Sequence, residues 1–276
     1  MVSIVEYAYE LAKSCRIDSH DMIKSVPADD SRSLVDMINK CVEKLHSIPD
    51  IIYIAHSLPF IKGKEKDELS CFPRVSVIYL SGMPCAVTHM AVNIAVSQLE
   101  IGKYNRILIV GADKAYSTWE RSFFGTIMGD MVLSMMLERG DGPYEILASN
   151  IDTVLYAAEG ENSDPEQILK YRSTLPLLLR DAYMRCLSQC GLESVDFIAP
   201  HTSARAIWDV LAEMIHIDRS RILDENIVNT GHFNSNDSFY HYFTHCENDT
   251  IKHGQTAMLI NPGFGGTRGC TVLRRK

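Results

Sequence analysis

The sequence predicts an α/β protein whose sheet is covered by helices on both faces. Apolar segments rich in β-branched residues alternate along the chain with segments of helical periodicity. The apolar segments are nearly continuous rather than alternating with polar residues, which is typical of strands buried on both faces. A weak internal duplication further indicates that the chain is made of two related halves.

Strands and helices are expected in a regular alternation. The segments with strand composition are residues 50–57, 74–82, 105–113, 131–137, 144–151, 196–200, 256–261 and 270–275. The segments with helical periodicity are residues 33–46, 86–102, 166–190, 204–215 and 237–247. Polar residues at 62–70 (KGKEKDELS) predict a surface loop. Those at 159–167 (EGENSDPEQ), which include Pro165, predict the entry to a long helix.

The duplication relates segments from the two parts of the chain. A helix, a turn and SIPDIIYIAHS (47–57) in the first part parallel a helix, a turn and ESVDFIAPHTS (193–203) in the second. Each part closes with two strands, which are separated by a Gly-Asp pair in the first and by GFGGTRG (263–269) in the second. We therefore predict an N-terminal half, residues 1–157, and a C-terminal half, residues 158–276.

Composition and charge restrict the class of function. The formal net charge of −8 argues against broad binding to nucleic acid, which requires a basic face. No apolar run approaches the roughly 20 residues that span a bilayer, and the first residues, MVSIVEYAYELAKSC, lack the long apolar stretch of a signal peptide. We therefore expect a cytoplasmic protein whose eight scattered cysteines are reduced thiols.

Cys85 is the first candidate for a catalytic residue. The apolar strand at 74–82 ends in Ser81-Gly82, and the turn Met83-Pro84 then places Cys85 at the start of the next predicted helix. The free amides and the positive dipole at a helix N-terminus favour the thiolate, the reactive form of cysteine, and also suit an oxyanion. The alternative is a buried structural cysteine in a packed turn, which is common.

His201, Asn234 and a glycine-rich loop are the other candidates. His201 follows the predicted strand at 196–200, and catalytic groups gather at the carboxyl ends of strands in α/β sheets. Asn234 lies in a polar turn before a helix, and the glycines of residues 261–269 (NPGFGGTRG) allow the backbone to approach a ligand closely. Each feature has an ordinary alternative: a loop histidine, a turn or N-cap residue, and a tight turn.

The order of these segments resembles the ketoacyl-ACP synthase III branch of the thiolase superfamily over residues 34–276. Cys85 and the strand NRILIVGAD (105–113) are similar to the nucleophile segment of that family and the strand that follows it. FFGTIMGDMVLSMML (123–137) is similar to the family's F-G-D-G-A-G-A-x-x-L stretch, with a matching Gly-Asp pair at 129 and 130.

The candidate site residues match family motifs individually. His201 matches the histidine of P-H-Q-A-N, and Asn234 matches the asparagine of H-G-N-T-S. Gly265 and Gly266 match the A-F-G-G-G loop. The resemblance therefore implies that Cys85, His201 and Asn234 are catalytic. It also implies that the backbone amides of Cys85 and Gly266 bind the oxyanion.

The resemblance also implies a fold and a reaction. The fold is expected to have five layers, α-β-α-β-α, built from two pseudo-equivalent halves, in a homodimer whose interface lies near the strand at 74–80. An acyl group from acyl-CoA or acyl carrier protein would be carried on Cys85. It would then join a malonyl-type thioester, as in a 3-oxoacyl-ACP synthase III of specialised lipid or secondary metabolism. No metal or redox cofactor is expected.

Further residues are expected to contact the substrates. Phe233 stands beside Asn234 where the family has glycine, and Phe264 lies in the glycine loop. Arg205 is nearest to the family's carrier-protein-binding arginine, one position out of register, and the family's opening segment is shorter here. Docking of an acidic carrier protein requires a local basic patch. The candidates for this patch are Arg205, Arg219, Arg221 and Lys252.

Three other functions remain open at this point. The acyl group could pass to an oxygen or nitrogen acceptor, although the retained Asn234 favours carbon–carbon bond formation. The chain could instead be a non-catalytic thiolase-fold subunit that partners an active homologue. A zinc site is the third, because His241 and His245 share a helical face next to Cys246. The similarly spaced Cys186 and Cys190 are expected at the edge of a core.

Overall fold

The computed structural model describes residues 1–19, 22–28, 32–58, 72–115, 121–123, 126–157, 159, 162–202, 205–224 and 230–276. The surface loop predicted at 62–70 lies outside these residues. None of the described helices is both long enough and apolar enough to cross a membrane. The described residues alternate between strands and helices, which confirms the predicted α/β class.

The predicted helices and strands occur close to their expected positions. Among the described residues the structure adds three strands at the N-terminus and two short strands at Ser122–Phe123 and Thr126–Ile127. The first elements are β1 (Val2–Leu11), β2 (Ser14–Ser19), β3 (Met22–Pro27), α1 (Leu34–Val42), β4 (Ile51–Ala55), β5 (Ser76–Leu80), α2 (Val87–Glu100), β6 (Arg106–Asp113), β7 (Ser122–Phe123), β8 (Thr126–Ile127) and β9 (Met131–Arg139). The later elements are β10 (Tyr144–Thr153), α3 (Pro165–Cys190), β11 (Phe197–Pro200), α4 (Arg205–Ile215), α6 (Asp237–Glu247), β12 (Thr256–Gly263) and β13 (Thr267–Arg275). Short 3-10 turns are η3 (Arg219–Arg221), η4 (Asn234–Asn236) and η5 (Phe264–Gly266).

Within the described residues, the long strands form one nine-stranded sheet with the order β11-β12-β13-β10-β1-β9-β6-β4-β5. The pairs β4–β5, β4–β6 and β11–β12 are parallel, and the other neighbouring pairs are antiparallel. The order β4-β6-β9-β1 repeats as β11-β12-β13-β10, and β1 pairs with β10 at the centre. The two halves therefore share one topology. In the sheet, β10 lies next to β13 and therefore belongs with the strands of the second half. The division between residues 157 and 158 stays a prediction.

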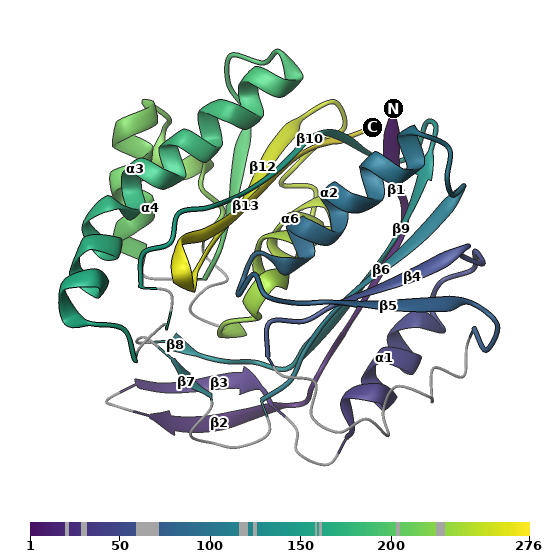
Figure 1. The fold of residues 1–276 in the computed structure, drawn as a ribbon, viewed down its shortest axis with the longest axis horizontal. Helices are drawn as coiled ribbons and strands as arrows, with labels where there is room; N and C mark the ends of the chain where they lie inside the picture. Colours follow the sequence, from purple (N-terminus) through teal and green to yellow (C-terminus); the bar gives the residue numbers. More distant parts are fainter. Residues whose placement is uncertain are drawn as a thin grey trace.

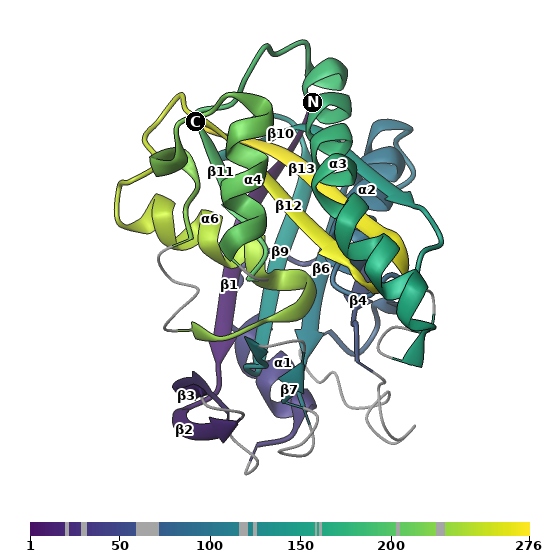
Figure 2. The same ribbon diagram turned by 90° about the vertical axis from the view of Figure 1, so that its left-hand side faces the viewer.

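Helices α2 and α6 lie between the two halves of the sheet (Figure 1). α1 covers the outer face of the first half, and α3 and α4 cover the outer face of the second, as Figure 2 also shows. Alternate residues of β4 serve different layers: Ile51 and Tyr53 belong to the central core with α2 and α6, whereas Ile52 and Ile54 pack in the core with α1. The layers thus follow the predicted order α-β-α-β-α.

β1 is a central strand that the pattern of apolar residues does not predict. Its sequence, VSIVEYAYEL, carries Glu6 and Glu10, which interrupt the apolar continuity that identified the other strands. Tertiary contacts satisfy both charges. Glu10 accepts hydrogen bonds from Arg32 at 2.6 Å and Lys44 at 2.8 Å, and Glu6 accepts one from the N–H of His46 at 2.7 Å. β1 can therefore pair with β9 and β10 and join the two halves.

Capping residues set the ends of the outer helices. α1 begins after a reciprocal capping box between Ser33 and Asp36. α3 begins after Asp164, whose side chain accepts a hydrogen bond from the second residue of the helix, with Pro165 in the first position. It ends at Gly191, which has a φ of 67°. The predicted entry to the long helix at residues 159–167 is thus correct.

Candidate active site

Cys85 lies on a strained turn between β5 and α2. Its φ is 58°, in the left-handed region that residues other than glycine rarely adopt, and the residue is 4% exposed. Such strain persists where the surroundings hold it, frequently at active sites. Here the carbonyl of Cys85 accepts a hydrogen bond from Nδ2 of Asn261 at 2.9 Å, and the carbonyl of Pro84 accepts one from the hydroxyl of Thr267 at 3.0 Å. Strands β12 and β13 therefore hold the turn that carries Cys85.

His232, which was not among the predicted site residues, contacts the sulfur of Cys85. Its Nε2 lies 3.8 Å from the Sγ of Cys85, within range of a hydrogen bond to sulfur. The Nδ1–H on the other side of the ring donates to Oδ2 of Asp237 at 2.7 Å. All three residues are buried. Cys85, His232 and Asp237 thus have the arrangement of a nucleophile, a base and a carboxylate that orients the base.

Thr202 and the backbone hold the carboxylate of Asp237 in place. The N–H of Thr202 donates to Oδ2 of Asp237 at 3.0 Å, and the Thr202 hydroxyl donates to the same oxygen. The N–H of Phe233 donates to Oδ1 at 2.6 Å. Because the partner of one ring nitrogen sets the tautomer and orientation of a histidine, this carboxylate directs Nε2 of His232 toward Cys85.

The predicted catalytic residue His201 lies in the same cluster. The side-chain sulfur and nitrogen atoms of Cys85, His201 and His232 that could bind a ligand all lie within 4.8 Å of one another. The rings of His201 and His232 meet edge to face, with centroids 4.5 Å apart. Neither ring nitrogen of His201 has a hydrogen-bond partner among the described residues, and its Nε2 is 3.6 Å from Oδ2 of Asp237. The structure brings His201 beside Cys85, while its catalytic role stays a prediction.

Asn234 lies on η4, which is tied to the turn of Cys85. It has a φ of 52° and is 2% exposed, and its Nδ2 has no hydrogen-bond partner among the described residues. Asn261, which binds the carbonyl of Cys85, also donates to the carbonyl of Ser235 at 3.2 Å. A buried amide without a partner costs about 1–3 kcal/mol, and a role in binding or catalysis is one explanation for retaining it.

The predicted oxyanion donors differ in their surroundings. The N–H of Cys85 donates to Oγ of Ser57 at 3.1 Å, so an oxyanion at this amide has to displace that hydroxyl. Asp113 holds this segment, because its Oδ1 accepts the N–H groups of Ser57 and the next residue at 2.8 and 2.9 Å. Gly266 has a φ of 74°, and a Cβ there would overlap the carbonyl of Val154. The roles of both amides stay predictions.

The two phenylalanines predicted to contact the substrate are placed differently. Phe233 is 1% exposed, and its ring packs on Gly129 and lies 5.2 Å from the ring of Tyr240. Phe264 is half-buried, with its ring 5.7 Å from that of Tyr171. Contact between either side chain and a substrate stays a prediction.

The arginines of the predicted basic patch are paired with carboxylates or with backbone carbonyls. Arg205 donates to Asp224 at 3.0 Å, and Arg219 forms ion pairs with Asp224 and Asp209. Arg221 donates to two backbone carbonyls just before β11. These pairs reduce the positive charge available to an acidic partner, so the patch is weaker than the sequence suggests. Substrate binding by Arg205 stays a prediction.

The alternative metal ligands on α6 do not come together. His241, His245 and Cys246 are buried, and within the part of the chain that the structure describes they form no group with a third ligand close enough for one ion. The group that does so consists of Cys85, His201 and His232. On α3, Cys186 is buried and Cys190 is half-buried, as expected at the edge of a core.

The charges in the cluster follow from burial and from Asp237. Burial would lower the pKa of His232, but the charge and hydrogen bond of Asp237 outweigh it and raise this pKa to about 10. Burial would raise the pKa of Asp237, but His232 holds it well below its usual range. Burial lowers the pKa of His201 to about 3, and the charge of His232 acts in the same direction. Near neutral pH the cluster therefore contains a protonated His232 and a neutral His201.

We expect these shifts to make the protein most stable near pH 6.5, the usual pKa of histidine. Above this pH the unfolded chain releases the proton of His232, whereas the folded protein keeps it to about pH 10, so stability falls as the pH rises. Below it the unfolded chain protonates His201 and His89, which stay neutral in the fold to about pH 3, so stability falls as the pH drops. Burial raises the pKa of Asp113 to about 6, which favours the folded protein as the pH drops. This single group acts against two histidines, so a loss of stability at acid pH is still expected.

Urea unfolding between about pH 4 and pH 10 measures this dependence. Between about pH 6.5 and pH 8 the variant His232→Gln is expected to lose the alkaline decline, because His232 causes it in this range. Above about pH 8 a decline is expected to remain, because burial raises the pKa of Cys41 and Cys246 to about 11. A wild-type midpoint that rises steadily above neutral pH would contradict the charge assigned to His232.

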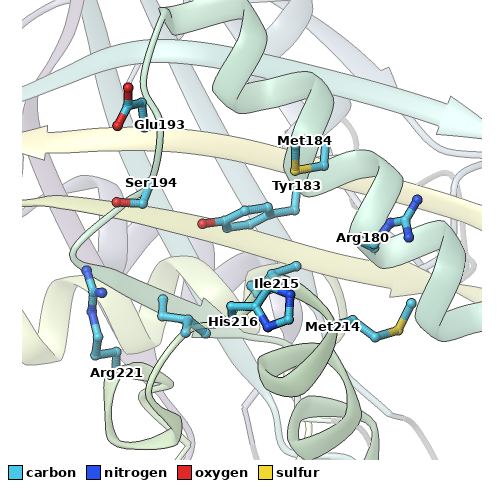
Figure 3. A pocket seen from close by; sticks show the side chains of 10 residues that line it. Arg180, Tyr183, Met184, Glu193, Ser194, Met214, Ile215, His216 and Arg221 are labelled. Carbon is cyan, nitrogen blue, oxygen red and sulfur yellow. The ribbon is translucent and has the colours of Figure 1, made fainter.

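A cavity of about 490 Å³ lies apart from the Cys85 cluster (Figure 3). Arg180 and Tyr183 of α3 line it together with Met214 of α4 and Ser194, which precedes β11. Neither Cys85 nor its contacting residues line this cavity, so it is separate from the candidate active site.

Sequence comparisons match the second half of the chain most directly. The family model described as 3-oxoacyl-[acyl-carrier-protein (ACP)] synthase III C terminal matches residues 187–275. The chain is 24% identical over 212 residues to the β-ketoacyl-[acyl-carrier-protein] synthase III of Mycobacteroides abscessus, and 26% identical over 210 residues to that of Rickettsia bellii. Both alignments cover 69% of this chain. They cover 62% and 65% of the two relatives, less than two thirds of their length.

Solved structures share the fold along the whole chain. ChlB3, described as an acyltransferase, has a TM-score of 0.82 at 16% identity, covering 99% of this chain and 97% of that one. The 3-oxoacyl-[acyl-carrier-protein] synthase III of Aquifex aeolicus has a TM-score of 0.81 at 18% identity, covering 99% of this chain and 100% of the other. At these identities the likeness shows the fold. The chain is thus similar to ketoacyl-ACP synthases III over part of its sequence and shares their fold, as its motifs predicted.

Proposed function

We propose that this chain is a thioester-dependent acyltransferase that carries the acyl group on Cys85 and passes it to an oxygen or nitrogen acceptor. One observation carries the proposal: Nε2 of His232 faces the sulfur of Cys85 at 3.8 Å while its Nδ1 is bonded to Asp237 at 2.7 Å. A thiol, an imidazole and a carboxylate in this order form an activated nucleophile. A base held in this way can also remove the proton of an attacking O–H or N–H group.

In the first half-reaction, Cys85 attacks the carbonyl carbon of an acyl-CoA or acyl-carrier-protein thioester. The protonated His232 stabilises the thiolate beside it. A bond forms between the sulfur of Cys85 and the acyl carbon, the bond to the leaving sulfur breaks, and His232 gives its proton to that sulfur. The amides of Cys85 and Gly266 are the proposed donors to the oxyanion. The reaction uses no cofactor beyond the thioester.

In the second half-reaction, the now neutral His232 takes the proton of the acceptor as the acceptor attacks the acyl carbon. The bond to Cys85 breaks, so its thiolate and the protonated His232 are restored together. Asp237 stabilises the imidazolium each time it forms. The likeness in fold to ChlB3, a protein described as an acyltransferase, supports this class of reaction.

Condensation with a malonyl-type thioester, the reaction that the sequence favours, is the second candidate. Nδ2 of Asn234 and both ring nitrogens of His201 are buried and have no hydrogen-bond partner among the described residues. Neutral donors of this kind suit the enolate that forms when a malonyl group loses carbon dioxide. The sequence relatives described as β-ketoacyl-[acyl-carrier-protein] synthase III support this candidate.

An acylation experiment tests the first step, which both candidates share. Incubation with acyl-CoA of several chain lengths is expected to increase the intact mass by one acyl group, and peptide mapping is expected to place this group on Cys85. Cys190→Ala is the matched control, because it removes a half-buried thiol at the end of α3 and is expected to leave the adduct unchanged. The absence of an adduct at every chain length would favour a non-catalytic subunit that partners an active homologue.

The product released from the acyl-enzyme separates the two candidates. A panel of alcohols and amines is expected to give an ester or an amide without release of carbon dioxide. A 3-oxoacyl product from a malonyl thioester, formed with release of carbon dioxide, would instead assign condensation. In that case Asn234→Ala is expected to stop the condensation while the adduct on Cys85 still forms, because Asn234 acts only in the second step.

We also propose that the chain forms a homodimer, or a heterodimer with a homologue, through β5. This strand is at one edge of the sheet, where it pairs with β4 alone among the described strands. Its Ile78 is 44% exposed. An edge strand offers unpaired backbone groups to another chain, which supports an interface at this position.

A further inference from the structure

We infer that Cys85, His201 and His232 form a binding site for Zn²⁺, and that the ion competes with the acyl group for the sulfur of Cys85. The first part concerns metal binding alone, whereas the competition rests on the proposed function. One thiolate and two imidazoles are a donor set that binds zinc, with the fourth tetrahedral position left to water.

The donor atoms already lie at separations close to those that one ion requires. They are all within 4.8 Å of one another, and Sγ of Cys85 is 3.8 Å from Nε2 of His232. With a Zn–S bond of about 2.3 Å and Zn–N bonds of about 2.0–2.1 Å, tetrahedral coordination separates a sulfur from a nitrogen by about 3.6 Å. Cys85 and His232 therefore need to approach by only a few tenths of an ångström. A donor atom of His201 at the 4.8 Å limit has to move at most about 1.5 Å closer to the other two donors, and rotation of its side chain can supply this movement.

His232 is oriented in the manner of a metal-binding histidine. In zinc sites the ring nitrogen that does not bind the ion usually donates to a carboxylate or a carbonyl, which fixes the tautomer and increases the basicity of the ligand. Nδ1 of His232 donates to Asp237, and Thr202 holds the same carboxylate. The supporting groups of a zinc site are therefore present in the protein without metal.

His201 provides a second, independent observation. It is 5% exposed, and neither ring nitrogen has a hydrogen-bond partner among the described residues. The proposed transfer reaction assigns no step to this ring, and burial of polar atoms without partners is unfavourable. An ion coordinated by Cys85 and His232 would give one of these nitrogens a partner.

The ion and the acyl group exclude each other at the sulfur. Zinc coordinates the thiolate of Cys85 and the neutral ring of His232, so binding releases the proton that His232 holds at Nε2 and changes no oxidation state. Acylation turns the same sulfur into a neutral thioester, which removes the anionic ligand from the site. Coordination in turn occupies the lone pairs with which Cys85 attacks a thioester. Zn²⁺ is therefore expected to inhibit acylation.

Titration of the metal-free protein with Co²⁺ tests the site, because a thiolate–Co²⁺ bond gives a charge-transfer absorption band. We expect the band to saturate at about one equivalent per chain and Zn²⁺ to abolish it by displacing Co²⁺. Cys85→Ser is expected to remove the band, and His201→Gln is expected to weaken binding by about 10–100-fold or more. Cys190→Ser is the matched control and is expected to keep the band.

A second measurement reads the thiol directly. Zn²⁺ is expected to slow the alkylation of Cys85 by iodoacetamide, measured by peptide mass, and EDTA is expected to restore it. A Co²⁺ band that persists in Cys85→Ser, or an affinity that His201→Gln leaves unchanged, would overturn the site.

The metal site and the proposed function fail separately. Co²⁺ binding without an acyl adduct in the metal-free protein would leave the metal site standing and remove the proposed function. An adduct without Co²⁺ binding would do the reverse. Where both occur, loading with Zn²⁺ is expected to lower the yield of acyl-Cys85, and an unchanged yield would overturn the competition.

Discussion

Replacing Asp237 with asparagine is expected to slow acyl transfer by about 10³–10⁴-fold. The carboxylate accepts the Nδ1–H of His232 at 2.7 Å and stabilises the positive charge of the ring. An asparagine lacks that charge, and its amide N–H can donate to Nδ1 and thereby place the ring proton on Nε2. Neutral His232 in that tautomer cannot accept a proton at the nitrogen that faces Cys85. Both half-reactions need proton transfer at Nε2 of His232, so both are expected to slow.

Single-turnover acylation of Cys85 by acyl-CoA, followed by intact mass, measures the first step, and release of the acyl group to the acceptor measures the second. Asp196→Asn is the matched control. Its carboxylate also accepts a backbone N–H and a hydroxyl, both of Thr256 at 2.8 Å, but it precedes β11 at the end opposite His201. We expect this variant to stay within a few fold of the wild type. A folded Asp237→Asn protein that keeps more than about a tenth of the rate would remove Asp237 from the mechanism.

Replacing Gly263 with alanine is expected to destabilise the protein by about 2–4 kcal/mol and to abolish acylation of Cys85. A Cβ at this position would overlap the carbonyl oxygen of Pro84 and lie 2.9 Å from its carbonyl carbon. It would also overlap the hydroxyl of Thr267, which donates to the same carbonyl. Because Pro84 directly precedes Cys85, relief of the overlap has to move the turn that positions the nucleophile.

Urea unfolding measures the loss of stability, and the mass of the acyl adduct measures the displacement of Cys85. Gly191→Ala is the control for the general effect of adding a methyl group. A Cβ there meets open space, but its φ of 67° costs an alanine about 1–2 kcal/mol. This control is expected to lose stability while the adduct still forms. Normal acylation in Gly263→Ala would show that the backbone relaxes without moving Cys85.

The elements that the sequence predicts correctly are those whose signals are local. Apolar runs, helical periodicity and turn residues lie within each segment, so the later strands and the main helices could be placed directly. β1 lacks such a signal, because the groups that neutralise Glu10 lie elsewhere in the chain. Arg32 and Lys44, its hydrogen-bond partners, are 22 and 34 residues away from it. The strand that joins the two halves is stabilised by contacts that no local window contains.

The candidate site divides in the same way. The turns of Cys85, His201 and Asn234 could be predicted because each lies beside a strand or helix end with a recognisable sequence. The choice of base could not, because Cys85 and His232 are 147 residues apart and meet only in the folded protein. Asp237 has no local feature that separates it from an ordinary acidic residue in the first turn of a helix.

From the sequence alone one could derive the class of fold, the candidate nucleophile and the family likeness, since all three depend on local motifs and on their order along the chain. The tertiary structure alone selects His232 over His201 as the residue that contacts Cys85 while bonded to a carboxylate. It does so because β12 and β13 hold the turn of Cys85 against η4 and the start of α6, which places His232 between the sulfur and Asp237.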